Sequence, residues 1–142
     1  MLKKILGLSP KLESDGSFSP SKMALKMSVS AQTDFEHISY EKYKGSRSKI
    51  LVIFTEHKNL KMKNGKYFST GNHPVEALLP MLHLQHAGFE FEIATPTGKP
   101  VVFEMWAFPE KDEHVNAIYK ELKSNFDNPL NLSDFIDNSF DN

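Results

Sequence analysis

The pattern of hydrophobic and polar positions predicts an α/β chain built around one buried parallel strand. Residues 50–54 form a continuous apolar run between polar neighbours, a pattern typical of a strand that is covered on both faces. A second strand is predicted at 89–94, where apolar and polar residues alternate, and a third at 101–106. A helix predicted at about 73–87 joins the first two strands, so these elements form a βαβ unit.

The helix at 73–87 is predicted to be buried, because apolar residues surround almost its whole circumference. Asn72 or His73 can cap it, and Pro74 suits its first turn. Pro80 is expected to kink the helix, and Gly88 suits the left-handed position after its end.

The remaining segments are predicted with less regular structure. A polar loop at 55–71 carries an Asn64-Gly65 turn, and 31–48 is predicted to lie extended over the domain. An amphipathic helix is predicted after Pro109, and a short helix at 132–136. Only two further strands flank the first, so the predicted sheet is incomplete.

The chain divides by composition into an arm and a domain. Residues 1–34 are rich in Ser and Lys and predict a flexible N-terminal arm, in which only 23–27 offer a helical turn. Residues 35–142 are predicted to form one domain. The apolar start of the arm ends at Ser9-Pro10, too early for a signal peptide, so a cytoplasmic location is expected.

Charge and cysteine content narrow the functional classes. Seventeen Lys and Arg against eighteen Asp and Glu give a net charge of −1, which provides no whole-chain argument for nucleic-acid or membrane partners. No apolar run approaches the roughly 20 residues that cross a membrane. The chain has no cysteine, so disulfides, thiolate metal sites and a cysteine nucleophile from this chain are excluded.

The candidate functional stretch is the loop at 65–76, which delivers Glu76 onto the first turn of the predicted buried helix. A carboxylate at that position interacts favourably with the positive end of the helix dipole. From the residues alone, Glu76 is therefore a helix-stabilising acid.

Several motifs together resemble the N-terminal half of the HchA family in the PfpI-like superfamily. They are Phe68-Ser69-Thr70-Gly71-Asn72-His73-Pro74-x-Glu76, Leu78-Leu79-Pro80, Gly88-Phe89-Glu90-Phe91-Glu92 and Phe103-Glu104-x-Trp106-Ala107-x-Pro109-x-Lys111-Asp112-Glu113. The similarity runs from about Phe35 to Asn142. It implies a flavodoxin-like sandwich of the class I glutamine-amidotransferase type, of which residues 35–142 are one half.

The resemblance also implies a chemistry. Family members are described as glutathione-independent glyoxalases (glyoxalase III, methylglyoxal to lactate), as deglycases and as heat-shock holding chaperones. In that chemistry a cysteine attacks the aldehyde carbon, a histidine shuttles protons and a glutamate hydrogen-bonds the cysteine. Glu76 matches this glutamate, and Gly71, Asn72 and His73 match the active-site loop. The cysteine and its histidine belong to the other half of the family fold.

The family's metal site, two histidines and a glutamate, matches this chain only at Glu90. Gln85 and Leu122 stand at the histidine positions, so the site is expected to be lost and no cofactor is expected. A different set, His83, His86 and Glu90, stays open as an alternative.

Two functional hypotheses follow. In the first, the chain is a truncated or split HchA-type protein that is inactive alone. In a variant of this hypothesis, a C-terminal half on a separate chain completes it, and the complex acts on small aldehydes. In the second, it is a non-enzymatic, chaperone-like protein that holds unfolded clients on exposed apolar surface. A homodimer is a further candidate assembly in either case.

Overall fold

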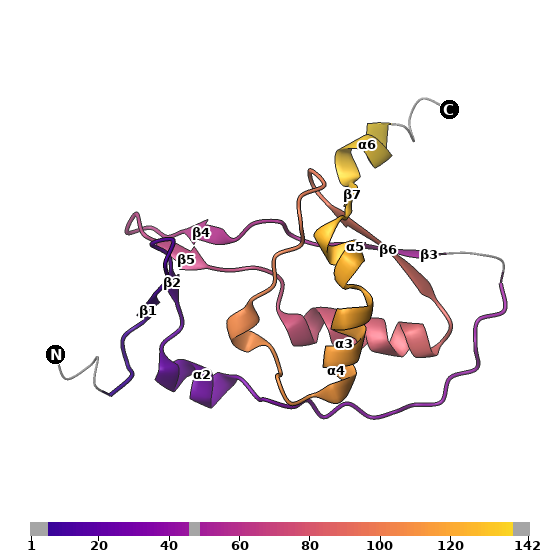
Figure 1. Cartoon of the computed structure of the whole chain (residues 1–142), viewed down its shortest axis with the longest axis horizontal. Helices are drawn as coiled ribbons and strands as arrows, with labels where there is room; N and C mark the ends of the chain where they lie inside the picture. Colours follow the sequence, from indigo (N-terminus) through magenta and orange to yellow (C-terminus); the bar gives the residue numbers. More distant parts are fainter. Residues whose placement is uncertain (1–5, 46–48, 138–142) are drawn as a thin grey trace.

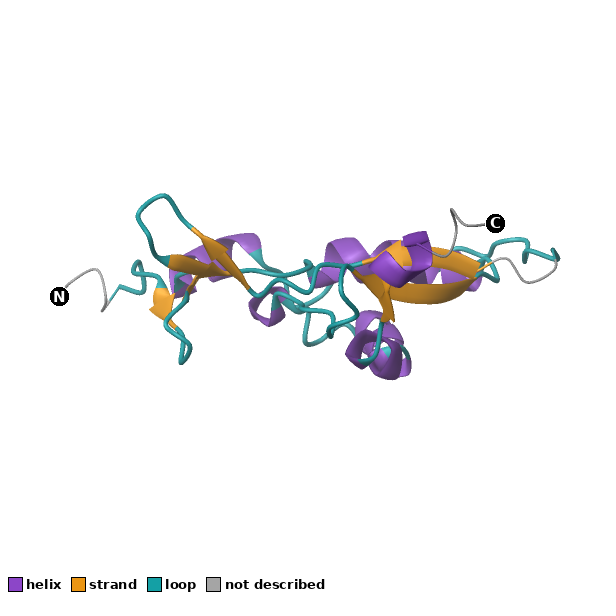
Figure 2. Ribbon diagram, turned by 90° about the horizontal axis from the view of Figure 1, so that it is seen from above, coloured by secondary structure: helices purple, strands orange, loops and turns teal. Residues whose placement is uncertain are grey.

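The computed structural model describes residues 6–45 and 49–137, which form an elongated α/β molecule with a sheet at each end (Figures 1 and 2). One sheet has the strand order β3-β6-β7 and the other the order β1-β2-β5-β4. In the part of the chain that is described, no helix is long and apolar enough to cross a membrane.

The β3-β6-β7 sheet is parallel throughout and contains the predicted βαβ unit. Strand β3 (Lys49–Ile53) pairs with β6 (Glu90–Thr95), with Leu51 opposite Glu92 and Val52 opposite Ile93. Strand β7 (Leu130–Asn131) continues the sheet beyond β6. The predicted strands at 50–54 and 89–94 and the α/β class are therefore confirmed.

Helices α3 (Pro74–His86) and α4 (Glu113–Glu121) pack against each other and close the core of the molecule (Figure 1). Helix α3 continues through Pro80, and Gly88 after its end has a φ of 89°. The predicted amphipathic helix divides at Leu122 into α4 and α5 (Lys123–Asp127), and α6 (Leu132–Asp137) follows. The buried core consists of Phe54, Leu78, Met81, Leu82, Ile93, Phe103, Phe108, Val115, Ile118 and Phe126.

The prediction that the first strand is covered on both faces is wrong for the described residues. Strand β3 lies at the edge of its sheet, and Leu51 and Ile53 are 39% and 55% exposed. Val52 packs against the core from the opposite face. Because side chains alternate along a strand, the helices cover only the face that carries Val52.

The predicted strand at 101–106 is also wrong. Phe103 forms only an isolated bridge with Asn72, and the 3₁₀ helix η1 (Met105–Ala107) follows. The backbone around Val102 is bonded to Asn72 and Thr55 rather than to a neighbouring strand. The third strand is β7 instead, whose two residues are too few to produce an alternating pattern.

The second sheet combines the N-terminal segment with the loop predicted at 55–71. Strands β1 (Lys11–Leu12) and β2 (Phe18–Ser19) join β5 (Tyr67–Ser69) and β4 (Asn59–Lys61), and Phe18 lies parallel to and opposite Phe68. The Asn64-Gly65 turn is confirmed, with a φ of 79° at Gly65. Helix α2 (Lys22–Ser28) contains the predicted helical turn. The division of the chain at residue 35 stays a prediction.

Residues 29–45 run without regular structure along α4 and α3, as the extended segment predicted for this region (Figure 1). The Lys111 backbone N–H donates to the Ala31 carbonyl at 2.9 Å, and the Tyr43 N–H to the Ala87 carbonyl at 2.8 Å. The Tyr43 ring stacks on Phe89 with 4.8 Å between ring centroids. The segment is thus fixed near the start of α4 and the end of α3.

Asp112 joins this segment to α4. Its side chain caps the helix by accepting from the Val115 N–H at 3.0 Å, and it accepts from the Thr33 N–H at 2.9 Å and from the Thr33 hydroxyl. Burial acts to raise the pKa of Asp112, but hydrogen bonds from Thr33, Val115 and His114 outweigh burial and hold the pKa below its ordinary value.

Asp112→Asn is expected to lower the unfolding free energy at pH 7 by about 1–2 kcal/mol, because an asparagine can still cap the Val115 N–H but its Nδ2 cannot accept from the Thr33 N–H and hydroxyl. The folded-state pKa of Asp112 is the lower one, so its stabilisation is full above about pH 4 and is lost as the pH falls through the folded-state pKa. The variant should therefore show a shallower loss of stability in acid, measured by urea unfolding at pH 7 and at lower pH. Asp127→Asn, in the exposed pair with Lys123, is the control and should change stability by less than about 0.5 kcal/mol. Equal effects of both variants would contradict the assignment.

Candidate functional site

The loop that leads from β5 to α3 places Glu76 on the first turn of α3, as predicted. The helix begins at Pro74, after an N-cap at His73 whose side chain makes no capping bond. Glu76 is exposed, although Pro74 and Leu78 on either side of it are buried. The helix thus presents this carboxylate to solvent from a fixed position.

Asn72 does not cap the helix but connects three segments by its side chain and backbone. Its Oδ1 accepts from the Thr55 N–H at 3.1 Å, and its Nδ2 donates to the carbonyls of Thr55 at 3.0 Å and Val102 at 2.7 Å. The backbone adds bonds from the Asn72 N–H to Val102 O at 2.8 Å and from the Glu104 N–H to Asn72 O at 3.0 Å. We call this set of bonds the Asn72 clamp.

Gly71 is required by the same close approach. A Cβ atom at this position would lie 2.7 Å from the Val102 carbonyl oxygen and 2.9 Å from the Phe103 carbonyl carbon. Both neighbours are backbone atoms, which cannot move aside cheaply. The glycine therefore allows the loop to lie directly against the segment at 102–104.

His73 lies beside the N-terminal segment, whereas Glu76 is exposed to solvent. It borders a cavity of about 320 Å³ together with Thr33, Asp34 and Leu79, among others. Its Nδ1 is buried and has no hydrogen-bond partner among the described residues. Four residues of this loop and helix start are the predicted active-site residues: Gly71, Asn72, His73 and Glu76. Gly71 and Asn72 hold the loop against the segment at 102–104, and Glu76 is the exposed one of the four.

The three positions that match the family's metal site, where loss of the site is predicted, lie apart from any group of ligands in the described structure. Glu90 is exposed at the start of β6, and Leu122 packs against the core. The Gln85 Nε2 donates to Glu121 Oε1 at 2.8 Å. Across residues 6–45 and 49–137, no three His, Asp or Glu side chains form a group suited to a metal ion, so the alternative set His83, His86 and Glu90 is not brought together.

A histidine cluster around Phe35 was not apparent from the sequence. The Phe35 ring lies 4.8–5.8 Å from the rings of His83, His86 and His114, and His37 lies 4.8 Å from His86. Burial, followed by repulsion from His37, His83 and His114, lowers the pKa of His86. The residues of this cluster are up to 79 positions apart in the chain. Their spacing therefore gives no indication in the sequence that they lie together.

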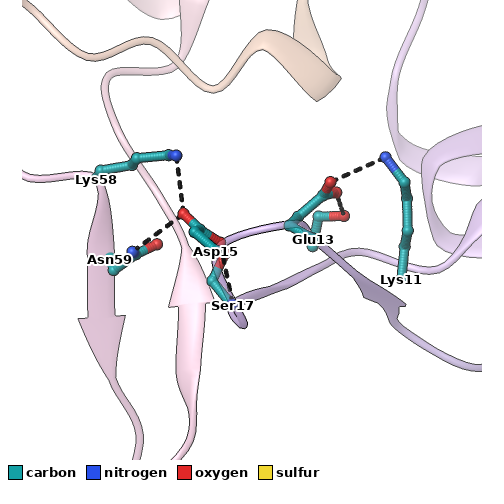
Figure 3. Close-up of polar contacts among 7 residues, drawn as sticks. Lys11, Glu13, Asp15, Ser17, Lys58 and Asn59 are labelled. Carbon is teal, nitrogen blue, oxygen red and sulfur yellow. Dashed lines mark hydrogen bonds and ion pairs between the residues drawn. The ribbon is translucent and has the colours of Figure 1, made fainter.

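A polar cluster at the opposite end of the molecule was also missed (Figure 3). Lys58 Nζ lies 2.8 Å from Asp15 Oδ2, and the Ser17 hydroxyl donates to Asp15 Oδ1 at 2.6 Å. These bonds, that from Lys58 foremost, hold the pKa of Asp15 well below its usual range. The cluster borders a cleft of about 370 Å³ that reaches Trp106. The contacts of Asp15 with Lys58 and Asn59 join the N-terminal segment to β4. Because its charges are paired, the cluster carries no excess charge.

Comparison with known proteins supports the resemblance of this chain to the HchA family. The chain is 46% identical over 122 residues to the protein/nucleic acid deglycase HchA of Escherichia coli O157:H7, covering 86% of this chain and 43% of that protein. It is 48% identical over 121 residues to the HchA of Pseudomonas aeruginosa, covering 84% and 41%. The chain is a relative of the HchA deglycases. No family model matches it.

The match covers the N-terminal part of the HchA proteins. The chain therefore spans about two fifths of the length of these relatives, and its parallel sheet and helices agree with their flavodoxin-like fold. The resemblance to the HchA family and the predicted fold class are confirmed.

Asn72→Asp is expected to lower the unfolding free energy by about 2–4 kcal/mol, because the side chain loses both donors and places a carboxylate against the carbonyls of Thr55 and Val102. Urea unfolding followed by circular dichroism measures the change. The matched control is Asn64→Asp, where the side chain accepts from the Lys66 N–H and an aspartate can still accept. The control should lose about 0.5 kcal/mol or less; a similar loss in both variants would show that the Asn72 clamp does not stabilise the fold.

Proposed function

We propose that this chain supplies the Glu76-bearing part of an HchA-type deglycase, and that residues equivalent to the remaining part of the HchA proteins supply the thiol nucleophile. The observation that carries the proposal is the exposed Glu76 carboxylate on a helix that Pro74, Leu78, Met81 and Leu82 bury against the core. Identity of 46–48% to proteins named as deglycases supports the same assignment. The chain itself contains no cysteine.

The proposed chemistry divides between this chain and that remaining part. The thiol adds to the carbonyl carbon of an aldehyde such as methylglyoxal, or of the corresponding adduct on a protein or nucleic acid. The new C–S bond replaces the π bond of the carbonyl, and the thiol proton passes to the carbonyl oxygen. Glu76 accepts a hydrogen bond from that thiol and so orients it for attack. A hydroxyl of this chain does not replace the thiol, because a hydroxyl nucleophile needs an adjacent base to activate it.

The arrangement of α3 suits this role. Buried Leu78, Met81 and Leu82 hold the helix against the core, and the Asn72 clamp fixes the loop immediately before it. A carboxylate held by a packed helix loses little orientational freedom when a partner approaches. No residue of the described structure covers the carboxylate, so it is accessible to that remaining part.

The test combines the full chain with the remainder of the Escherichia coli relative, the part outside the 122 matched residues, expressed as a separate polypeptide. Conversion of methylglyoxal to lactate and release of adducts from glycated protein are measured. We expect no turnover by either polypeptide alone and turnover by the mixture. Glu76→Gln should reduce that turnover about 100-fold or more.

Glu113→Gln is the matched control, because Glu113 is also an exposed acid on the first turn of a helix. It should leave turnover within about twofold of the unmodified mixture, as expected for a surface substitution. Turnover of methylglyoxal by the chain alone, abolished by Glu76→Gln, would show that no second polypeptide is needed. An inactive but assembled mixture would contradict the proposed activity.

A second candidate function, a chaperone-like protein that holds unfolded clients, is favoured by one observation. Leu51, Ile53 and Leu60 are between 39% and 57% exposed on two strands, and exposed apolar surface of this kind can retain unfolded chains. The expected result is suppression of a client's thermal aggregation at equimolar amounts, measured by light scattering. Precipitation of the chain together with the client would remove this candidate.

A further inference from the structure

We infer that one end of this molecule docks on the surface of an anionic lipid membrane. Residues 6–28 and 57–69 form that end, which we call the basic end. It contains α2 and the β1-β2-β5-β4 sheet and lies opposite the β3-β6-β7 sheet along the molecule (Figures 1 and 2). The inference goes beyond the proposed function and does not depend on it. Its support is the distribution of charge, an apolar row across the sheet and an apolar stripe along α2.

Charge is distributed unevenly between the basic end and the rest of the molecule. Residues 6–28 and 57–69 carry seven lysines and two acids, whereas residues 29–56 and 70–142 carry eight Lys and Arg and sixteen Asp and Glu. The two acids of the basic end, Glu13 and Asp15, form ion pairs with Lys11 at 3.0 Å and Lys58 at 2.8 Å. The other lysines of the basic end have no ion pair among the described residues: Lys22, Lys26, Lys61, Lys63 and Lys66. The net charge of −1 therefore conceals a positive end on an otherwise negative chain.

Four apolar side chains form a row across the sheet of the basic end. The paired positions are Leu12 with Phe18, Phe18 with Phe68, and Phe68 with Leu60. Residues directly opposite each other on neighbouring strands share one face of a sheet, so the row crosses all four strands. Leu12 and Leu60 at its two ends are 63% and 57% exposed, and Lys66 Nζ lies 5.1 Å from the centroid of the Phe18 ring. This face thus presents apolar surface and a positive charge together.

Helix α2 carries a second set of exposed apolar side chains. Met23 and Met27 lie one turn apart on the same side of the helix and are 41% and 79% exposed. None of the residues of α2, all of which the structure describes, is buried. The Met23 N–H donates to the Gly7 carbonyl at 3.1 Å, which places Leu6 and Leu8, 54% and 48% exposed, close to the first turn of the helix. The apolar surface therefore extends beyond the helix itself.

Apolar and positively charged side chains that lie side by side match the surface of an anionic membrane. Lys22 and Lys26 each precede a methionine along α2, so the lysine stripe runs next to the methionine stripe. Their flexible stems allow the ammonium groups to reach lipid phosphates while the apolar side chains enter the interface.

The charge distribution also determines the orientation of the molecule. Anionic headgroups attract the basic end and repel the acidic remainder, so the basic end approaches the membrane first. A nucleic acid would pair with the lysines through its phosphates but would leave the leucines and methionines exposed to water. A lipid surface accounts for both kinds of residue, and it is the partner that we assign.

The experiment measures binding of the full chain to lipid vesicles by co-sedimentation. One set of vesicles is phosphatidylcholine alone, and the other contains about one third phosphatidylserine. We expect at least tenfold tighter binding to the anionic vesicles. Raising the ionic strength from about 0.05 M to about 0.5 M should weaken that binding roughly tenfold, because salt screens the lysines from the headgroups.

Charge variants test the contribution of the lysines. Lys61→Glu combined with Lys63→Glu should weaken binding to the anionic vesicles about 30-fold or more, because attraction near the surface becomes repulsion. The matched control combines Lys99→Glu with Lys120→Glu, two exposed lysines outside the basic end, and should change binding less than threefold. Circular dichroism of the free variants checks that each remains folded.

Apolar variants test the contribution of the row and the stripe. Met27→Ser and Leu60→Ser should each weaken binding to the anionic vesicles about fivefold or more, because less apolar surface enters the interface. Leu51→Ser is the matched control, since Leu51 is 39% exposed on β3 in the other sheet, and it should leave binding within about twofold. Equal losses in Leu60→Ser and Leu51→Ser would contradict the assigned surface.

Amide hydrogen exchange locates the docked surface on the folded chain. With anionic vesicles the amides of residues 22–28 and 60–66 should exchange at least threefold more slowly, whereas those of α4 should not change. Equal binding to both kinds of vesicle, or no binding to either, would overturn the inference. Binding to a single-stranded oligonucleotide but not to vesicles would assign the basic end to nucleic acid and would also overturn it, as would a dimer of the chain that Leu60→Ser dissociates.

Discussion

The carboxamide of Asn72 is the interaction on which the arrangement of the candidate site depends. It bonds to both backbone groups of Thr55 and to the Val102 carbonyl, while its own backbone pairs with Val102 and Glu104. Three segments far apart in the chain thereby meet at one side chain. Because Pro74 begins α3 only two residues later, the same bonds determine where Glu76 lies relative to the end of β3.

The sheet beside this clamp has one well-packed face and one open face. Val52 and Ile93 pack into the core with Leu78 and Met81, whereas Leu51 and Ile53 are exposed. A two-layer arrangement of this kind buries one side of the sheet and leaves an edge strand whose composition suits a three-layer α/β protein. The HchA relatives are about twice as long as this chain, and this difference in length gives the open face a physical explanation.

Part of the fold was predictable because its signals are local. The apolar run at 50–54 and the alternation at 89–94 indicated the parallel pair, and helical spacing with Pro74 and Gly88 indicated α3. The strand predicted at 101–106 failed, because its backbone bonds are taken by Asn72 and Thr55, and no local pattern reports such long-range bonds. Strands β1, β2 and β7 have two residues each, too few for a periodic signal.

The sequence by itself determined the α/β class, the position of Glu76 on a first helical turn, the absence of a thiol and the resemblance to the HchA family. Only the tertiary structure decided that Asn72 is a structural clamp, that three histidines gather around Phe35 with a fourth against His86, and that β3 is an exposed edge. The physical reason is the range of the interactions. Helix starts, turns and periodicity depend on neighbouring residues, whereas clamps, clusters and strand edges depend on which distant segments the whole chain brings together.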